Sequence, residues 1–178
     1  MLSDLTAETM RLVDDYLQHY LSGSALSHSH TAKTLWRVAD KLESCEKTFF
    51  HSICCTAILP EPGRAAAHLS RVAMQMESDG GLNCGRVVAL FVFTGTLATA
   101  LADKGAREEI GSLTKALVIY LSVEKREWLE VHGGWNEFYH YFNKHGSDSI
   151  NRYDTKSNTF IATAGFVLAG LAFLLAVR

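Results

Sequence analysis

The segment between Arg86 and Asp103 has no polar side, and this pattern predicts that it lies at the centre of the fold. Between Arg86 and Asp103 there is no charged residue, and apolar residues occupy every side of the helical wheel. A helix that is apolar on every side must be buried on every side. Its uncharged run of about 16 residues is shorter than the roughly 20 needed to cross a bilayer, so we expect a central helix inside a bundle. Asn83 is a good N-cap, which places Gly85 and Arg86 in the first turn, where we expect the helix to reach the surface.

The other apolar patterns predict helices with a single apolar side. Their apolar residues recur at steps of three and four, which is the spacing of one helical face. These expected helices cover residues 5–21, 31–45, 63–77, 106–123, 125–131 and 134–143. A short apolar segment around residues 49–58 is ended by Pro60 and Pro62, because proline stops a helix at or before the preceding residue. Alternating strand-like runs bounded by turns are absent from the sequence, so we expect an all-α fold.

The end of the chain has a different character. Residues 146–158 are polar and are interpreted as a linker, whereas residues 160–177 form a run of about 18 uncharged residues. That length is at the lower edge of what spans a membrane. We therefore expect residues 159–178 to be a transmembrane tail anchor, with the domain facing the cytosol. The alternative is a C-terminal helix that folds back into a groove of the domain itself.

Composition narrows the possible functions. A chain of 178 residues suits one compact domain, and a formal net charge of −2 gives no electrostatic reason to expect nucleic-acid binding. The four cysteines, of which Cys54 and Cys55 are adjacent, are interpreted as reduced thiols and not as zinc ligands. The sequence contains no HExxH motif, phosphate-binding glycine loop or nucleophile signature, so we expect neither a cofactor, a metal site nor an enzyme.

Two motifs carry a resemblance to a known family. Residues 79–98, DGGLNCGRVVALFVFTGTLA, resemble the BH1 signature of the Bcl-2 family of apoptosis regulators, whose Asn-Trp-Gly-Arg core here has Cys84 in place of tryptophan. Residues 128–142 resemble the BH2 signature with its Gly-Gly-Trp core. Residues 5–21 are similar to a BH4 helix, and residues 31–45 to a BH3 motif. Similarity to the Boo/Diva/Nrz branch of the family covers nearly the whole chain and implies a Bcl-2-like helical bundle over residues 1–145.

The resemblance implies an anti-apoptotic function. Such a protein would hold BH3 helices of Bax/Bak-like proteins, and of BH3-only proteins such as Bim or Bad, in a hydrophobic groove and so restrain permeabilisation of the mitochondrial outer membrane. Arg86 is expected to pair with the aspartate of the BH3 helix, because a guanidinium forms two charge-assisted hydrogen bonds with a carboxylate. The groove residues implied in this way are Leu42, Phe49, Phe50, Ile53, Val72, Met76, Asn83, Gly85, Arg86, Val88, Ala89, Phe93 and Phe142.

A second partner and a cellular location follow from the same resemblance. Related proteins tune calcium release by acting on inositol trisphosphate receptors through their BH4 region. The corresponding face here consists of Leu12, Val13, Tyr16 and Leu17. The resemblance implies attachment to the mitochondrial outer membrane, the endoplasmic reticulum or both. Two other functions stay open, namely a pore-forming executioner using residues 87–123 and a membrane-tethered scaffold whose groove is occupied by its own tail.

Cys84 is the main departure from the family pattern. The family tryptophan packs toward the Gly-Gly-Trp segment, so its loss predicts a void near that segment. Such a void would cost roughly 3–5 kcal/mol of stability if nothing filled it. Trp135, Phe138 and Tyr139 are the side chains expected to fill it. We therefore expect Cys84 to affect ligand preference more than the fold.

Overall fold

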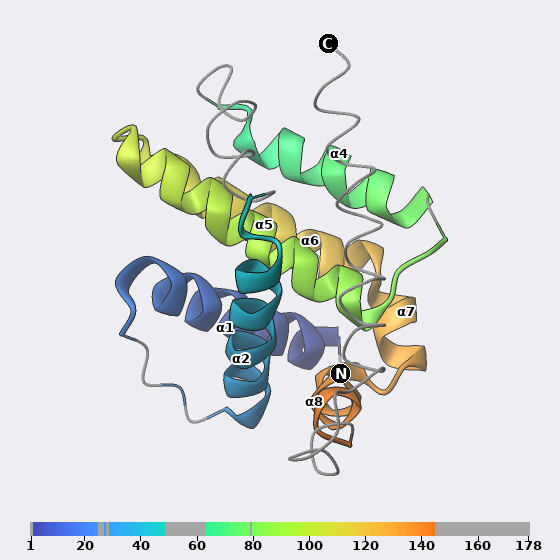
Figure 1. Ribbon diagram of the computed structural model, residues 1–178. Coiled ribbons are helices and arrows are strands. Elements are labelled where there is room, and N and C mark those ends of the chain that lie inside the picture. The colour runs from blue at the N-terminus through green and yellow to red at the C-terminus, as the bar shows by residue number, and fades with distance from the viewer. Residues whose placement is uncertain (1, 25–26, 28, 49–62, 79, 145–178) are drawn as a thin grey trace.

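The computed structural model describes residues 2–24, 27, 29–48, 63–78 and 80–144. The regular secondary structure of this part of the chain is entirely helical, with no strand (Figure 1). Its α-helices are α1 (Leu2–Ser22), α2 (His30–Cys45), α4 (Ala65–Ser78), α5 (Cys84–Asp103), α6 (Ile110–Ile119), α7 (Arg126–Val131) and α8 (Gly134–Lys144). A 3₁₀ turn, η1 (Arg107–Glu109), precedes α6, and a π-helical turn, η2 (Tyr120–Glu124), follows it. The all-α prediction is confirmed for these residues.

Helix α5 forms the centre of the bundle, as its uniform apolarity predicts. It begins at Cys84 after Asn83, whose side-chain oxygen accepts a hydrogen bond from the Arg86 amide nitrogen at 2.9 Å. Every residue from Gly85 to Ala98 is buried. Within the described residues, α5 is the one helix long and apolar enough to cross a membrane, but 83% of its most apolar window is buried inside the protein. That burial identifies it as a core helix.

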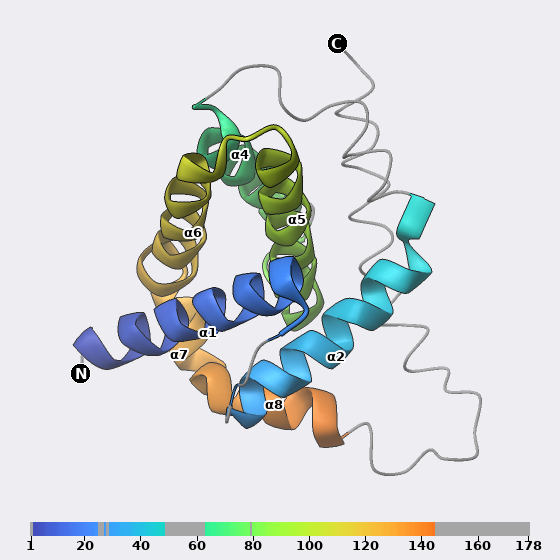
Figure 2. The same cartoon turned by 90° about the vertical axis from the view of Figure 1, so that its left-hand side faces the viewer.

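The remaining helices cover α5 from several sides. Helices α5 and α6 lie side by side, α4 packs on both, and α1 crosses them (Figures 1 and 2). Helix α2 packs on α1, α5 and α8, so that α8 closes the end of the bundle. Each of these helices turns its apolar side inward, which removes that surface from water and is the main stabilisation of the fold. The arrangement places the first turn of α5 near the α7–α8 pair.

One expected helix is divided in the structure. Residues 106–123 were predicted as a single helix, but η1, α6 and η2 share this stretch. In the wide turn of η2, the three successive residues Tyr120, Leu121 and Ser122 are all buried, which the three- and four-residue spacing of an α-helix does not anticipate. The turn closes with a hydrogen bond from the Lys125 amide to the Tyr120 carbonyl at 2.9 Å. The predicted helix boundaries elsewhere agree within three residues.

Several predictions lie outside the described residues. These are the apolar segment that ends at the two prolines, the polar linker and the C-terminal apolar run. The expected groove residues Phe49, Phe50 and Ile53 also lie there. The other residues predicted for the groove lie within the described part of the chain.

Candidate functional site

Arg86 is held at the start of α5 by a turn of two glycines. Its Nη1 donates a hydrogen bond to the carbonyl oxygen of Gly81. Gly80 and Gly81 have φ values of 125° and 81°, a region that residues with a side chain rarely adopt. A Cβ atom at Gly80 would lie 3.7 Å from Nη2 of Arg86. Glycine is thus favoured here by the backbone conformation, and the resulting turn brings the Gly81 carbonyl to the guanidinium.

The charge of Arg86 suits an acidic ligand. The N-terminus of a helix carries a partial positive charge, and a guanidinium beside it adds a full one. A carboxylate at this position would meet a planar, two-pronged donor. Within the described part of the chain, no group of three or more His, Cys, Asp and Glu side chains could hold a metal ion. Arg86 is nevertheless only 7% exposed, so it is more buried than the predicted position at the surface end of the helix implies.

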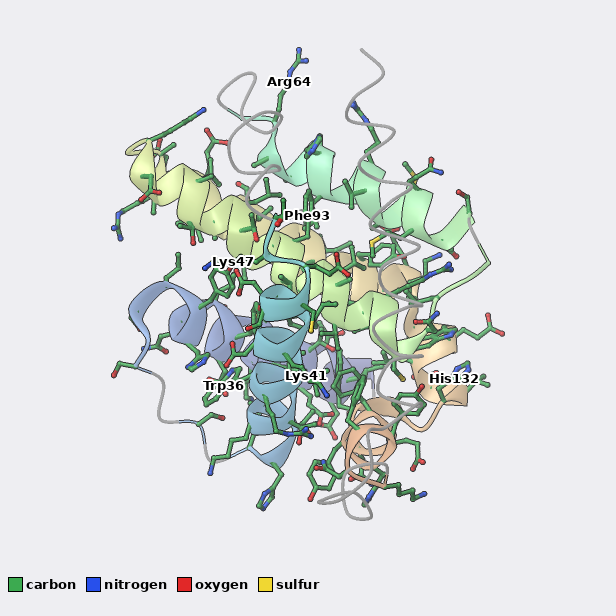
Figure 3. The ribbon with its side chains drawn as sticks, in the orientation of Figure 1. Trp36, Lys41, Lys47, Arg64, Phe93 and His132 are labelled. Atoms are coloured by element: carbon green, nitrogen blue, oxygen red, sulfur yellow. The ribbon has the colours of Figure 1, made fainter. Side chains whose placement is uncertain are left out.

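The described apolar residues predicted for the groove lie on three helices and belong to one apolar core. Val72 and Met76 come from α4, Leu42 from α2, and Val88, Ala89 and Phe93 from α5. The ring of Phe93, labelled in Figure 3, lies against that of His68 on α4, with 5.9 Å between the two ring centroids. All six side chains are at most 3% exposed. They are therefore buried here and do not form an open trough, so a ligand helix would touch them only after displacing what now covers them.

Phe142 is the predicted groove residue on α8, which packs on α2. It is partly buried on α8 and packs edge-on against Phe138, with 4.9 Å between the centroids. Gly85, in the first turn of α5, is buried, and Asn83 is partly buried at the cap. The side-chain oxygen of Asn83 accepts the cap hydrogen bond from the Arg86 amide, so its side-chain NH2 group remains as a donor for a ligand. Every described residue predicted for the groove thus lies on α2, α4, α5 or α8, or at the cap of α5.

The void predicted at Cys84 is present and is not filled. A cavity of about 210 Å³ lies between the start of α5 and the α7–α8 pair. It is lined by Leu82, Asn83, Cys84, Val87, Trp128, Leu129, His132, Gly134, Trp135, Glu137, Phe138 and Tyr141. Burial raises the pKa of the Cys84 thiol to about 11, with the Glu137 carboxylate adding to the effect. The thiol is consequently protonated at neutral pH.

The side chains expected to fill the void do not occupy it. Trp135 is 1% exposed, and its Nε1 donates a hydrogen bond of 2.9 Å to Oγ1 of Thr9 on α1. Its ring also packs edge-on against Phe91, at 6.2 Å between centroids. Trp135 and Phe138 therefore form walls of the cavity, and Tyr139 does not line it. The sequence did not identify Trp128, His132 or Tyr141 as lining residues, although the loss of a tryptophan at position 84 signalled where the space would be.

The face expected to bind a second partner is part of the core. Leu12, Val13, Tyr16 and Leu17 are each at most 5% exposed. The Tyr16 ring packs edge-on against Phe91 of α5, with 5.2 Å between the centroids. Amphipathic spacing predicts an apolar face but not what covers it. Here the bundle covers it, so a partner would reach these residues only if α1 left the bundle.

Comparison with known proteins agrees with this architecture. A family model described as apoptosis regulator proteins of the Bcl-2 family matches residues 35–135. The anti-apoptotic protein NR13 of Gallus gallus is 51% identical over 178 residues, which is the full length of both chains. NR13 of Coturnix japonica is 49% identical over the same length. Among solved structures, the zebrafish pro-survival protein NRZ in its complex with Bad BH3 has a TM-score of 0.74 and 30% identity, covering 80% of this chain and 97% of that one. This chain therefore belongs to the Bcl-2 family of apoptosis regulators.

Proposed function

We propose that this protein is an anti-apoptotic regulator that binds BH3 helices and so restrains permeabilisation of the mitochondrial outer membrane. The observation that carries the proposal is Arg86, a cation held at the N-terminus of α5, the helix that also carries the predicted groove residues Val88, Ala89 and Phe93. The similarity along the full chain to anti-apoptotic NR13, and to NRZ with Bad BH3, supports it.

The proposed recognition is that of an amphipathic helix in an apolar groove, of which BH3 peptides are a known example. Val88 and Phe93 are buried, so they would have to become accessible before apolar residues of the ligand could pack on them. The ligand aspartate would accept hydrogen bonds from Arg86, whose planar guanidinium has five N–H donors. Because Nη1 already donates to Gly81, the turn holds the guanidinium in place before the ligand arrives, which lowers the ordering cost of binding.

The test is the affinity of the full chain, reconstituted in lipid nanodiscs, for a Bad BH3 peptide. Truncating one partner of a desolvated charge pair costs about 2–5 kcal/mol, or roughly 30-fold to several thousandfold in affinity. We therefore expect Arg86→Ala to weaken binding by more than about tenfold in calorimetry. Arg107→Ala is the matched control, because Arg107 is an exposed arginine in η1, beyond the opposite end of α5. Unchanged affinity for folded Arg86→Ala would overturn the role of Arg86.

A peptide in which the BH3 aspartate is replaced by alanine completes the cycle. If the two groups pair, replacing the aspartate lowers the affinity of the peptide for the wild-type chain. The same replacement then has little effect on its affinity for Arg86→Ala, which has already lost the pair. Equal losses on both backgrounds would show that the aspartate is bound by another group.

The direction of the activity is tested on dye-filled liposomes. An anti-apoptotic protein blocks the dye release that Bax causes. It causes no dye release itself when an activating BH3 peptide is added. Release caused by the chain alone with that peptide would instead identify an executioner that inserts the α5–α6 pair. Tighter peptide binding after removal of residues 159–178 would identify a groove occupied by its own tail.

We further propose that residues 1–145 form the binding domain, residues 146–158 a linker and residues 159–178 a membrane anchor. The uncharged run of residues 160–177 supports the anchor. Resistance of the full chain to alkaline extraction from mitochondrial or endoplasmic-reticulum membranes, lost after truncation at residue 158, is the expected result. Regulation of an inositol trisphosphate receptor through α1 is not part of this proposal, because the face concerned is buried.

A further inference from the structure

The cavity beside Cys84 is separate from the proposed peptide site. The α5 residues assigned to the peptide, Val88, Ala89 and Phe93, do not line it, whereas Val87 on another side of the helix does. The residue that the two sites share is Asn83. On α5 the cavity is lined by Cys84 and Val87, neither of which is assigned to the peptide, so the two sites use different residues of this helix. Its walls are completed by α7 and α8.

The inner walls of this cavity are apolar and aromatic. Val87, Leu129, Trp135 and Phe138 are each at most 5% exposed. The rings of Trp135 and Phe138 meet edge to face, with 5.5 Å between their centroids. Close packing normally leaves few voids larger than a water molecule, so an apolar space of this size is unusual inside a small domain. The walls suit a flat hydrocarbon surface, because aromatic rings pack favourably edge to face or offset.

The mouth of the cavity is polar and open to solvent. Glu137 and His132 are exposed, and Tyr141 is 45% exposed. The ring of His132, which is labelled in Figure 3, stacks on the ring of Trp128, with 4.5 Å between the centroids. This aromatic pair borders one side of the opening. The Glu137 carboxylate, 3.5 Å from Nζ of Lys144, is an acceptor at the opening. A ligand inside could therefore direct an N–H or O–H donor toward this side.

The volume limits the occupant. About 210 Å³ exceeds the roughly 150 Å³ of an engineered apolar cavity that binds benzene. It falls below the roughly 300 Å³ at which pockets for drug-sized ligands begin. A peptide helix, about 10 Å across, does not fit such a space. Two fused aromatic rings are thus the class of molecule that matches both the size and the walls.

We propose that this cavity is a binding site for a small neutral molecule of two fused aromatic rings with one hydrogen-bond donor, of which indole is the simplest example. The rings would lie between Val87, Trp135 and Phe138, and the donor would face Glu137 at the mouth. The Cys84 thiol would contact the rings as a small, uncharged group. This inference does not depend on BH3 binding.

The test uses 5-fluoroindole with the full chain in lipid nanodiscs, followed by fluorine NMR. We expect a saturable shift of the fluorine signal that unlabelled indole reverses. Cys84→Trp places an indole inside the cavity and is expected to lower the affinity for 5-fluoroindole at least tenfold. Cys45→Trp makes the same change at an exposed cysteine of α2 and is expected to leave binding as in the wild type. Cys84→Ala, which removes only one lining atom, should retain binding within about threefold.

Two results would overturn the proposal. One is the absence of a saturable signal in the wild type. The other is equal binding to the wild type and to folded Cys84→Trp, which would mean that the probe dissolves in lipid or binds elsewhere. If Cys84→Trp does not fold, a diazirine-bearing indole applied to the wild type decides the question. Labelling confined to residues 82–87 and 128–141 supports the cavity, and labelling outside these segments excludes it.

Discussion

Gly95, in the middle of α5, lies directly against the ring of Tyr20 on α1. A Cβ atom at this position would lie 2.8 Å from Cγ and Cδ2 of the Tyr20 ring and 2.9 Å from Cε2. Because Cγ is fixed next to the Cβ of Tyr20, rotating the ring about its own axis does not relieve the contact. The change Gly95→Ala therefore forces the whole Tyr20 side chain, or α1 itself, to move.

The size of this effect can be worked out from the contacts of Tyr20. Overpacking a core position costs about 1–3 kcal/mol. The displaced ring would also lose the hydrogen bond that the Tyr20 hydroxyl donates to Oε1 of Glu43 at 2.6 Å, and a bond to a charged group contributes about 1.5–3 kcal/mol. Alanine recovers about 1 kcal/mol through its helix propensity. The expected net loss of unfolding free energy is about 1.5–5 kcal/mol, which lowers the Tm of a domain of this size by about 3–20 °C.

Thermal unfolding of the full chain, followed by circular dichroism at 222 nm, measures this loss. Gly111→Ala is the matched control: Gly111 lies in α6 with nothing within 4 Å of its Cβ position, so we expect it to stabilise the protein by about 0.5–1 kcal/mol. In a Tyr20→Ala background, Gly95→Ala should no longer destabilise, because the obstructing ring is gone. A Tm that falls equally in both backgrounds would refute the steric explanation.

Two further predictions follow from single contacts. Thr9→Val removes the acceptor of the Trp135 indole N–H and leaves that group buried, so we expect a loss of about 1–3 kcal/mol. Urea unfolding of Thr9→Val, Trp135→Phe and the double variant checks it, and strictly additive losses would show that the two residues do not interact. Burial raises the pKa of the Cys84 thiol from 9.0 to about 11, so its thiolate fraction at neutral pH is about 100-fold lower than without that shift. Iodoacetamide at pH 7.5, with each site quantified by mass spectrometry, should therefore modify Cys84 far more slowly than exposed Cys45, and equal rates would contradict the buried position.

The prediction of the candidate site depended on two features of the sequence, the BH1-like motif and the apolar run that follows Asn83. Asn83 was predicted as the N-cap from its residue type and from the apolar run after it, and the bond to the Arg86 amide confirms that position. The assignment of Arg86 to a ligand carboxylate rests on the resemblance and stays a prediction. Its bond to the Gly81 carbonyl could not be derived from sequence, because it depends on the fold of the glycine turn over the helix end.

The sequence by itself determined the all-α class, the central position of α5 and the membership in the family. These properties follow from residue order alone: a helix without a polar side has to be covered, and short motifs are read directly. Only the tertiary structure decided that the α1 face is covered by α5, that the helix expected over residues 106–123 ends in the π-helical turn η2, and that the space beside Cys84 stays open. The reason is that spacing shows which face of a helix is apolar but not which side chain packs on it. Trp135 illustrates this, because its hydrogen-bond partner Thr9 lies 126 residues away in sequence, and that contact keeps the indole ring out of the space that position 84 leaves empty.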